Sequence, residues 1–372
     1  MNQKTKTQSV FLGIGQDYPV WTLVFPVFSI LVALGLHFVS SATLMLWLGL
    51  PLLALLLVNV FASVHHAETI ALKIGNPYGS FVLAISVTIV EVAIILAVLL
   101  NSTDEVVTIA RDTVFATIMI VLNGIIGFAL LVGGLKFHKQ EFKAPGAVAA
   151  LSTLATIAVL TLVLPDFTIS IPGPVYAPPQ LIMVAVVSIA LYLIFLTVQM
   201  ISHRDDFTDI IAEETHHAPP TKQGFIAACI LLPVTLIAVI LLAESLSPMI
   251  ELTVNKAGLP IAMVGVVIAI TVLLPEGMAA IRAALNNRLQ TSINLALGSA
   301  LASICLTIPT VAMLTLFLDK PLALGLDGEH IVLLLLSLFV ATITLAMGRT
   351  TILQGAIHLV IFAVYLTIAS VP

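Results

Sequence analysis

Two glutamates stand in the middle of long apolar stretches, Glu91 in AISVTIVEVA and Glu276 in AITVLLPEGM. Aligning them also aligns the Ala, Ile and Val residues ahead of them, and it pairs Ser86 with Thr271. An ionisable side chain at the centre of a membrane helix costs about 2.5–3.5 kcal/mol on insertion scales, so such residues usually face a bundle interior or a water-filled cavity. The repeated glutamate therefore predicts a buried site.

Two buried carboxyl groups can bind either protons or a cation. Burial disfavours the ionised form of a carboxyl group, and a second carboxylate nearby disfavours it further. An arriving cation reverses this preference because it favours the ionised pair. Competition of this kind is what an antiporter requires. The structural alternative is that both glutamates are protonated and only join helices, but that role gives no reason for the same position in both stretches.

Hydroxyl groups supply further oxygen atoms near the glutamates. Pro275 has no N–H and would free the carbonyl of Thr271, which loosens the helix before Glu276. An oxygen-only site with two carboxylates suits a hard cation such as Ca²⁺. No histidine or cysteine lies within about a turn of either glutamate, which argues against zinc or copper. We expect Glu91 and Glu276 to bind cation and proton, with support from Ser86, Thr88, Thr113, Thr117, Thr271, Ser299 and Ser303.

The composition makes the bilayer the solvent of this chain. Of its 372 residues 60% are hydrophobic and 9% charged, with a mean hydropathy of +1.18, whereas soluble domains are about half apolar and a quarter charged. The net charge is only −5, and no basic cluster interleaved with aromatic residues indicates nucleic acid as a partner. The chain is expected to be an all-α integral membrane protein.

A helix needs about 20 mainly apolar residues to cross the hydrocarbon, and eleven stretches qualify. Turn-forming sequences such as GNPYG and PGPVYAPP separate some of them. The predicted spans are 21–39, 43–64, 79–100, 113–135, 147–165, 180–202, 224–244, 259–285, 291–318, 330–348 and 353–371.

Lysine and arginine residues orient these spans, because short cytoplasmic loops carry an excess of both. With the N-terminus inside, 11 of the 14 lie on the cytoplasmic side, and only Arg111, Lys256 and Lys320 lie on the outer side. The N-terminus is therefore predicted to be cytoplasmic and the C-terminus periplasmic or extracellular.

The correspondence between the two halves continues on the next predicted span. TVFATI, which begins at Thr113, matches SALASI, which begins at Ser299, and Thr117 then pairs with Ser303. In each half the two hydroxyls are spaced i, i+4, on one helix face. The third span runs from inside to outside and the eighth from outside to inside, so the repeats are inverted. Inverted repeats with polar residues at midplane depth are typical of secondary transporters.

The domain organisation follows from this duplication. We expect an N-terminal tail and leading helix at 1–42, a first inverted repeat at 43–202, an acidic cytoplasmic connector at 203–222 and a second inverted repeat at 223–372. The connector is interpreted as a solvated link between the halves, with a metal-sensing element as the alternative.

Four stretches carry a resemblance to a known family: NPYGSFVLAISVTIVEV, RDTVFATIMIV, LLPEGMAAIRAALNNRLQTSINLALGSALASICLTIP and GRTTILQGAIHLVIFAVYL. Through them the chain resembles the calcium/cation exchanger superfamily, specifically its bacterial ChaA-type calcium/proton and sodium/proton antiporters. The resemblance implies one leading helix, two inverted five-helix repeats, and a place in the bacterial inner (cell) membrane. It also implies that Glu91 and Glu276 bind cation and proton alternately and that the following hydroxyl-bearing helices complete the site.

One departure from the family pattern bears on selectivity. Many relatives carry Gly-Asn just ahead of each glutamate, where this chain has Val87 and Thr88 in one half and Val272 and Leu273 in the other. The asparagine amide is missing from both halves, which makes preference for Ca²⁺ less certain than antiport itself.

The predicted function is export of a hard cation, with Ca²⁺ as the main substrate, in exchange for protons by alternating access. Exchange of Na⁺ or K⁺ at the same site is the alternative that the sequence does not separate. A passive channel would not require titratable residues in matched repeats, and no HExxH, GxSxG or P-loop motif indicates a membrane enzyme. The expected partners are the transported cation, the proton and the bilayer; no cofactor is expected, and a homo-oligomer stays open.

Overall fold

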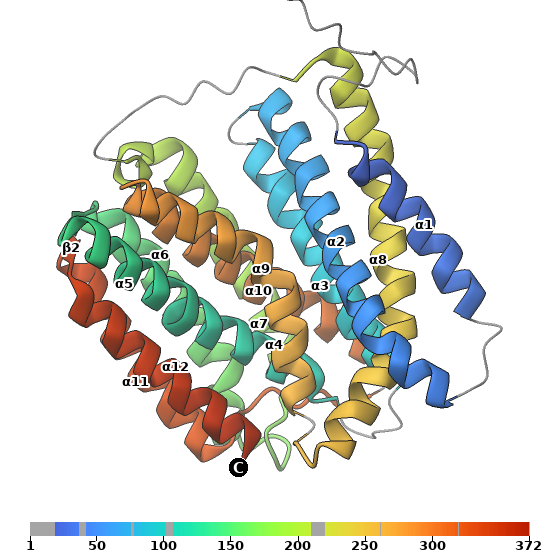
Figure 1. The fold of residues 1–372 in the computed structure, drawn as a ribbon. Helices are drawn as coiled ribbons and strands as arrows, with labels where there is room; N and C mark the ends of the chain where they lie inside the picture. The colour runs from blue at the N-terminus through green and yellow to red at the C-terminus, as the bar shows by residue number, and fades with distance from the viewer. Residues whose placement is uncertain are drawn as a thin grey trace, which may run out of the picture. The chain divides into compact units, whose positions relative to one another are not determined.

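The structure, a computed structural model, describes residues 19–36, 42–75, 78–101, 107–209, 220–260, 262–318 and 320–371. Residues 1–18 of the predicted N-terminal tail and residues 210–219 of the acidic connector lie outside the described residues. Almost all of the described chain is helical (Figure 1).

Each of the eleven predicted spans corresponds to a helix. α4 and α5 form one continuous span, because the π-helical turn η1 (Ile120–Ile125) joins them, and α7 continues into the π-helical turn η3 (Val198–Ser202). The helices are α1 (Trp21–Leu36), α2 (Ala42–Ile74), α3 (Tyr78–Asn101), α4 (Ile109–Met119), α5 (Ile126–Phe137), α6 (Ala144–Leu162), α7 (Pro178–Thr197), α8 (Lys222–Lys256), α9 (Ala262–Leu285), α10 (Leu289–Phe317), α11 (Gly328–Ala346) and α12 (Ile352–Ser370).

Helices α2 and α8 are longer than predicted. α2 continues past His65 and His66, and α8 continues past Glu244. The predicted ends followed the loss of hydropathy, but a helix satisfies its own backbone hydrogen bonds and can continue where polar side chains begin. Local signals set some other ends: α7 begins with Pro178, whose φ suits a first turn, and α2 ends before Gly75, whose φ is +77°.

Nine helices in the described part of the chain are long and apolar enough to cross a membrane. The other two predicted spans lie on α1, which has 16 residues, and on α3, which has 24. The chain is a multi-pass, all-α membrane protein, as predicted.

Helix lengths recur in the same order along the two halves. α2 and α8 have 33 and 35 residues, α3 and α9 have 24 each, and α6 and α11 have 19 each. The α4–α5 span and α10 have 29 each, and α7 together with η3 has 25 where α12 has 19. This order agrees with one leading helix followed by two five-helix repeats.

The chain forms two compact units, which do not coincide with the repeats. Unit 1 contains Met1–Val90 and Thr215–Leu246, and unit 2 contains Glu91–Glu214 and Ser247–Pro372. Each unit therefore draws segments from both halves, and α3 and α8 each contribute to both units.

In unit 1, polar side chains join α1 to α2. Asn59 Nδ2 donates a hydrogen bond to Ser29 Oγ at 2.7 Å, and Nε2 of His66 lies 3.2 Å from the carbonyl oxygen of Thr22. Apolar contacts join α2 to α8 through Ile70 and Ala228. The three helices run side by side in Figure 1.

In unit 2, glycines bring helices α5 and α12 close together. A Cβ atom at Gly355 would lie 2.5 Å from the backbone nitrogen of Leu131, and one at Gly127 would lie 2.8 Å from Cβ of His358. Small residues at helix contacts are typical of membrane proteins, where close packing rather than the hydrophobic effect joins helices. α10 contacts α4, α6, α7 and α9 and is the most central helix of this unit.

A buried chain of polar side chains connects α12, η1 and α11. His358 Nδ1 lies 3.0 Å from Asn123 Oδ1, and His358 Nε2 lies 3.2 Å from Thr344 Oγ1. Asn123 Nδ2 also donates to Ser337 Oγ at 2.8 Å. With the asparagine oxygen accepting from Nδ1–H, Nε2 accepts from the threonine hydroxyl, so the neutral imidazole has a partner on each nitrogen.

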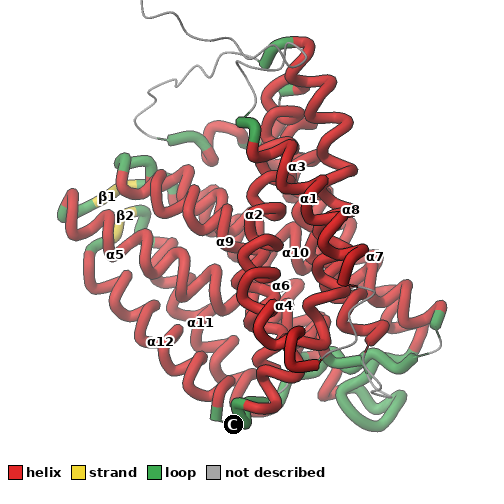
Figure 2. The backbone as a smooth tube through the Cα atoms, turned by 45° about the vertical axis from the view of Figure 1, so that its right-hand side comes forward, coloured by secondary structure: helices red, strands yellow, loops and turns green. Residues whose placement is uncertain are grey.

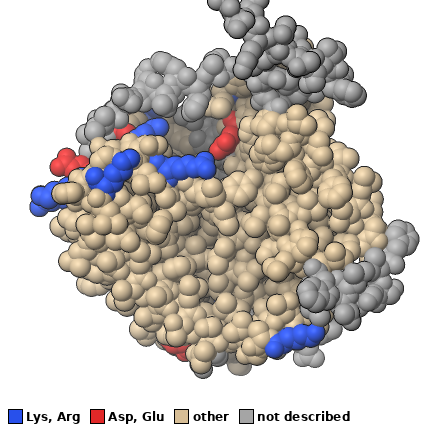
Figure 3. Space-filling model, in the orientation of Figure 1, with Lys and Arg blue, Asp and Glu red and all other residues tan. Residues whose placement is uncertain are grey.

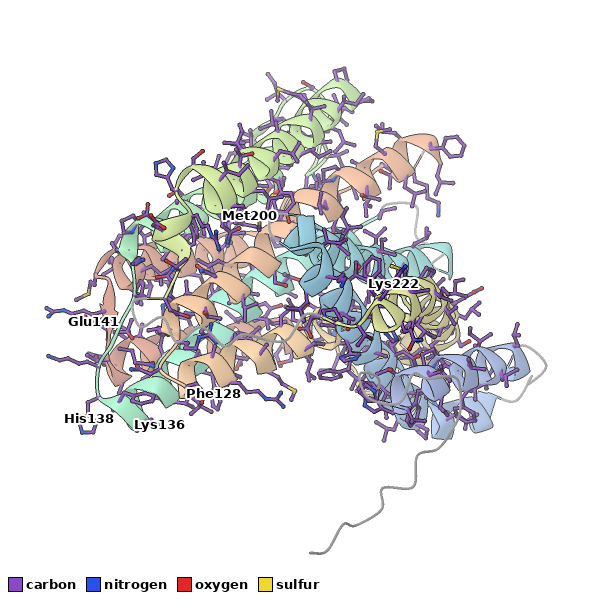
Figure 4. All side chains as sticks on the ribbon, turned by 90° about the horizontal axis from the view of Figure 1, so that it is seen from above. Phe128, Lys136, His138, Glu141, Met200 and Lys222 are labelled. Atoms are coloured by element: carbon purple, nitrogen blue, oxygen red, sulfur yellow. The ribbon has the colours of Figure 1, made fainter. Side chains whose placement is uncertain are left out.

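The loops of unit 2 gather at its two ends, as alternating spans require. At one end β1 (Gln140–Glu141) pairs antiparallel with β2 (Arg349–Thr350), and both strands lie in predicted cytoplasmic loops (Figure 2). At the other end Val107 forms a backbone bridge to Leu322, and both residues lie in predicted outer loops. The labelled residues Lys136, His138 and Glu141 mark the first of these ends in Figure 4.

Most Lys and Arg side chains on the face drawn in Figure 3 gather along one rim, and the broad surface over the helices carries almost none. Large apolar side chains on the helices are exposed, such as Ile182 and Leu193 on α7 and Phe339 on α11. An exposed apolar surface of this extent is expected where lipid replaces water.

Candidate cation-binding site

Glu91 is buried in unit 2 and is held by two hydroxyl groups of α10. The residue is 2% exposed. Ser303 Oγ donates a hydrogen bond to Glu91 Oε1 at 2.6 Å, and Thr307 Oγ1 donates to Oε2 at 3.1 Å. Both carboxylate oxygens thus accept from neutral donors, which satisfies part of the hydrogen-bonding capacity of a buried charge without neutralising it.

No basic side chain in the described part of the chain forms an ion pair with Glu91. A buried carboxylate is costly unless it is paired, protonated or bound to a metal ion. Since the neighbours of Glu91 are hydroxyls, the arrangement leaves its charge available to a cation or a proton. The binding of cation and proton by this glutamate stays a prediction.

Thr307 is a hydrogen-bond partner of Glu91 that the predicted set of hydroxyls lacks. Ser299, Ser303 and Thr307 follow one another at intervals of four residues, so they lie along one face of α10. This four-residue spacing is the sequence signal that could have identified Thr307. The comparison of the two halves concealed it, because the match between the halves ends one residue after Ser303 and the residue that corresponds to Thr307 in the first half is Val121.

Glu276 lies on α9 in the same unit, and its side chain is only partly buried. α9 packs closely against α4 and η1 on both sides of this glutamate: a Cβ atom at Gly265 would lie 2.9 Å from the backbone nitrogen of Thr113 in α4, and one at Gly277 would lie 3.1 Å from Cδ1 of Ile125 in η1. The glycines thus place the helix that carries the second glutamate against the helix that carries Thr113 and Thr117.

The two threonines of α4 are buried, as a role in the site requires. The hydroxyl of Thr113 is fully enclosed and has no hydrogen-bond partner among the residues that the structure describes. A buried hydroxyl without a partner costs free energy, so Thr113 has an oxygen free to serve a ligand. Thr117 is one turn further along the same face.

The other predicted hydroxyls have different surroundings. Ser86 donates to the carbonyl of Val82 at 2.8 Å, and Thr271 donates to that of Val267 at 2.8 Å, so both donors are used within their own helices. Ser86 and Thr88 belong to the part of α3 in unit 1. Ser299 is partly exposed and forms no hydrogen bond to Glu91 or to another described residue. Of the seven predicted hydroxyls, that of Ser303 forms a hydrogen bond to Glu91.

The contact between Glu91 and Ser303 crosses the two halves of the chain. Glu91 lies on α3 of the first half, and its partner lies on α10 of the second. Under the inverted-repeat relation, Glu276 on α9 would meet Thr117 on α4, the residue that matches Ser303. The close packing of α9 on α4 agrees with this pairing, which stays a prediction.

An ion pair fixes the first turn of α4 at the opposite end from the strands. Arg111 Nε donates to Asp112 Oδ1 at 2.8 Å, and Arg111 Nη1 donates to the carbonyl of Gly325 at 3.0 Å. Just outside the membrane spans, burial raises the pKa of the Asp166 carboxyl group, which lies against Gly325. These contacts hold the loop before α11 against the helix that carries Thr113.

Comparison with known proteins identifies the family of this chain. The family model described as sodium/calcium exchanger protein matches residues 44–201 and 227–371. The chain is 48% identical to the putative ionic transporter y4hA of Sinorhizobium fredii, over 95% of this chain and 97% of that protein. It is 36% identical to the sodium-potassium/proton antiporter ChaA of Escherichia coli, over 93% and 94% of the two chains.

The fold is also similar to a solved structure. The crystal structure of the selenium-substituted Ca²⁺/H⁺ antiporter protein YfkE superposes with a TM-score of 0.69 at 17% identity, over 95% of this chain and 99% of that chain. Since the family model matches most of the sequence and two relatives exceed 30% identity over nearly the full length, the chain belongs to the sodium/calcium exchanger protein family, a family of transporters and not of enzymes.

Proposed function

We propose that this protein exports a hard cation, with Ca²⁺ as the main substrate, in exchange for protons that bind the same two glutamates. The observation that carries the proposal is the buried Glu91 carboxylate, which accepts hydrogen bonds from Ser303 and Thr307 and has no basic partner among the described residues. Oxygen ligands with negative charge are those that Ca²⁺ prefers. The enclosed hydroxyl of Thr113 offers one more oxygen.

Hydroxyl partners suit a site that alternates between cation and proton. When Glu91 is ionised, the hydroxyls of Ser303 and Thr307 both donate to it. When Glu91 carries a proton, one hydroxyl can turn and accept it, because a hydroxyl group is both donor and acceptor. The carboxyl group therefore keeps hydrogen-bond partners in both states, which a fixed lysine or arginine would not allow.

Alternating access of this site to the two sides of the membrane completes the proposed mechanism. Inverted repeats support it, because they allow two related arrangements around one central site. We place the N-terminus in the cytoplasm, the C-terminus outside and the protein in a bacterial inner membrane, on the basis of the lysine and arginine distribution and of the bacterial relatives.

Exchange of Na⁺ or K⁺ for protons is the second candidate. It is favoured by the 36% identical relative, which is named a sodium-potassium/proton antiporter. It is also favoured by Thr88 and Leu273, which stand where many relatives have asparagine, because Ca²⁺ usually takes six to eight oxygen ligands and each missing amide oxygen removes one.

Transport in vesicles tests the proposal. Purified protein in liposomes is given an outward proton gradient (acidic interior), and the uptake of Ca²⁺, Na⁺ and K⁺ is measured separately together with internal pH. An antiporter accumulates the cation above its external concentration while the proton gradient decays. Uptake that stops at equal concentrations would instead indicate a channel, and the cation that dissipates the gradient at the lowest concentration identifies the substrate.

Removing single hydroxyls is expected to weaken the apparent cation affinity by graded amounts. Ser303→Ala should raise the concentration for half-maximal exchange by roughly threefold to tenfold, because polar bonds within membranes average about 0.6 kcal/mol and hydrogen bonds to charged groups contribute at least about 1.5 kcal/mol. Thr307→Val should have a smaller effect, since its contact is 3.1 Å rather than 2.6 Å. Thr117→Val should resemble Ser303→Ala if the repeats are equivalent.

Thr310→Val is the matched control for these variants. Thr310 is exposed, and its hydroxyl donates to the carbonyl of Leu306 in its own helix. Its replacement should leave the apparent affinity unchanged. Equal affinities in Ser303→Ala, Thr307→Val and the control would remove the α10 hydroxyls from the site.

A further inference from the structure

The first part of the acidic connector is bound to unit 2 and is not only a solvated link. Residues Arg204–Phe207 form the 3-10 turn η4, and Asp209 is the last described residue before the undescribed part of the connector. The aromatic ring of Phe207 is buried and meets that of Phe195 edge to face at 5.9 Å between centroids. Gly146 at the start of α6 leaves room for the carbonyl of Asp206.

Asp209 binds the first turn of α10 through both carboxylate oxygens. The backbone N–H of Thr291 donates to Oδ1 at 3.0 Å, and the hydroxyl of Thr291 donates to Oδ2 at 2.5 Å. Arg288 Nε also donates to Oδ2 at 3.0 Å. The N-cap residue of α10 is Arg288, whose own side chain accepts no hydrogen bond from the first turn. Asp209 thus supplies from a distant loop the acceptor that a helix start requires.

Two further contacts fix the same loop. Asn294 Nδ2, one turn into α10, donates to the carbonyl of Phe207 at 2.5 Å. Lys143 Nζ, at the start of α6, donates to the carbonyl of Asp205 at 2.5 Å and to Thr208 Oγ1 at 3.0 Å. The connector therefore binds α6 and α10 through side chains that recognise its backbone, in a fixed conformation.

The turn between α9 and α10 is also held by side chains from the end of α5 and from β1. Lys136 Nζ donates to the carbonyl of Leu285 at 2.7 Å, and Gln140 Nε2 donates to that of Ala284 at 2.9 Å. Both carbonyls belong to the last turn of α9, and that of Ala284 also accepts a hydrogen bond from the N–H of Asn287 at 3.1 Å. Gln140 Nε2 also lies 3.1 Å from Asn287 Oδ1. The turn that joins the Glu276 helix to the Ser303 helix therefore forms hydrogen bonds with both the acidic connector and the α5–β1 segment.

We propose that Asp209 is a positioning residue for cation exchange, which holds the cytoplasmic end of α10 and through it the Ser303 and Thr307 hydroxyls that engage Glu91. This inference rests on the proposed function. An exposed ion pair contributes little by itself, and Arg288 is 39% exposed whereas Asp209 is 10% exposed. The two hydrogen bonds from Thr291 therefore carry the role, and the charge of Asp209 is secondary.

If the acceptor role of Asp209 matters and its charge does not, the apparent cation affinities of the variants at this position should follow a definite order. Asp209→Asn keeps an oxygen that can accept from the Thr291 N–H, so its apparent cation affinity should stay within about twofold of the wild type. Asp209→Ala removes the acceptor and should raise the cation concentration for half-maximal exchange by about threefold to tenfold, the range expected for loss of one helix cap. Asp205→Ala removes a charge from the same turn, where the side chain is exposed, and should change nothing.

The experiment combines vesicle transport with hydrogen exchange of the full-length protein. Faster amide exchange over residues 289–294 in Asp209→Ala, but not in Asp209→Asn or Asp205→Ala, together with the affinity change, would establish the positioning role. A threefold rise that asparagine rescues is not expected from general destabilisation, which lowers the maximal rate and the amount of folded protein instead.

Two results would overturn the inference. In one, Asp209→Ala loosens the start of α10 and leaves the apparent affinity unchanged, so that the cap is structural only. In the other, the alanine and asparagine variants lose affinity equally, so that charge and not capping matters. Wild-type protein that exchanges no cation would refute the proposed function itself, whereas both results above presuppose an active wild type and concern Asp209 alone.

Discussion

Glu91→Gln is expected to abolish proton-coupled cation exchange while the protein still inserts and folds. Glutamine has the size of glutamate and can still form hydrogen bonds with Ser303 and Thr307, so the packing around α10 is retained. It can neither supply a negative charge to a cation nor carry the exchanged proton. The measurement is cation uptake into vesicles with an imposed pH gradient, where we expect a loss of at least about a hundredfold, as for removal of an essential charge.

Glu276→Gln should give the same result, because the proposed site needs both carboxylates. Glu329→Gln is the control: Glu329 is exposed in the first turn of α11, and its replacement should leave exchange within about twofold. Near-normal exchange in either of the first two variants would show that the glutamate only joins helices. Correct folding is checked by monodispersity in detergent and by an unchanged melting temperature.

The affinity for the cation is expected to strengthen as pH rises and to level off once both glutamates are ionised. Protons and cation compete for the same carboxyl groups, so cation binding releases protons and depends on pH. In the range where both groups are protonated, each proton displaced changes the apparent dissociation constant about tenfold per pH unit, up to about a hundredfold for two. Equilibrium binding of Ca²⁺ and Na⁺ to purified protein between about pH 5 and 9 measures this dependence.

The maximal rate need not follow the affinity, because return of the carrier requires protons. A bell-shaped rate against pH is therefore expected together with a monotonic affinity. In Glu276→Gln one titrating group is lost, so any residual binding should show a shallower dependence on pH. Binding that is independent of pH in the intact protein would mean that cation and proton occupy different sites, and the competition mechanism would fail.

The membrane spans and their order could be predicted because they depend on local properties. Length and hydropathy decide whether a stretch can cross the bilayer, and each of the eleven predicted stretches is a helix in the structure. The predicted ends of the helices were less accurate. α2 extends ten residues beyond its predicted end, from 64 to Ile74, because hydropathy reports what surrounds a helix and not where its backbone hydrogen bonds stop.

The connector shows the limit of composition as evidence. Its acidic residues are typical of a solvated segment, yet Asp209 binds the start of α10 and Phe207 is buried. Asp209 has the same residue type as its exposed neighbour Asp205. What distinguishes Asp209 is the position of α10 beside the loop, which no local pattern contains.

The sequence by itself determined that two glutamates would lie in apolar helices of an inverted duplication, because rare ionisable residues and their matched spacing are visible in the order of residues. Only the tertiary structure decided that Glu91 meets Ser303 and Thr307, more than 200 residues away, and that the hydroxyls of Ser86 and Thr271 bond within their own helices. The physical reason is that helix spacing fixes which residues share a face, whereas the rotation and close approach of neighbouring helices, set here by glycines such as Gly265, fix what that face contacts.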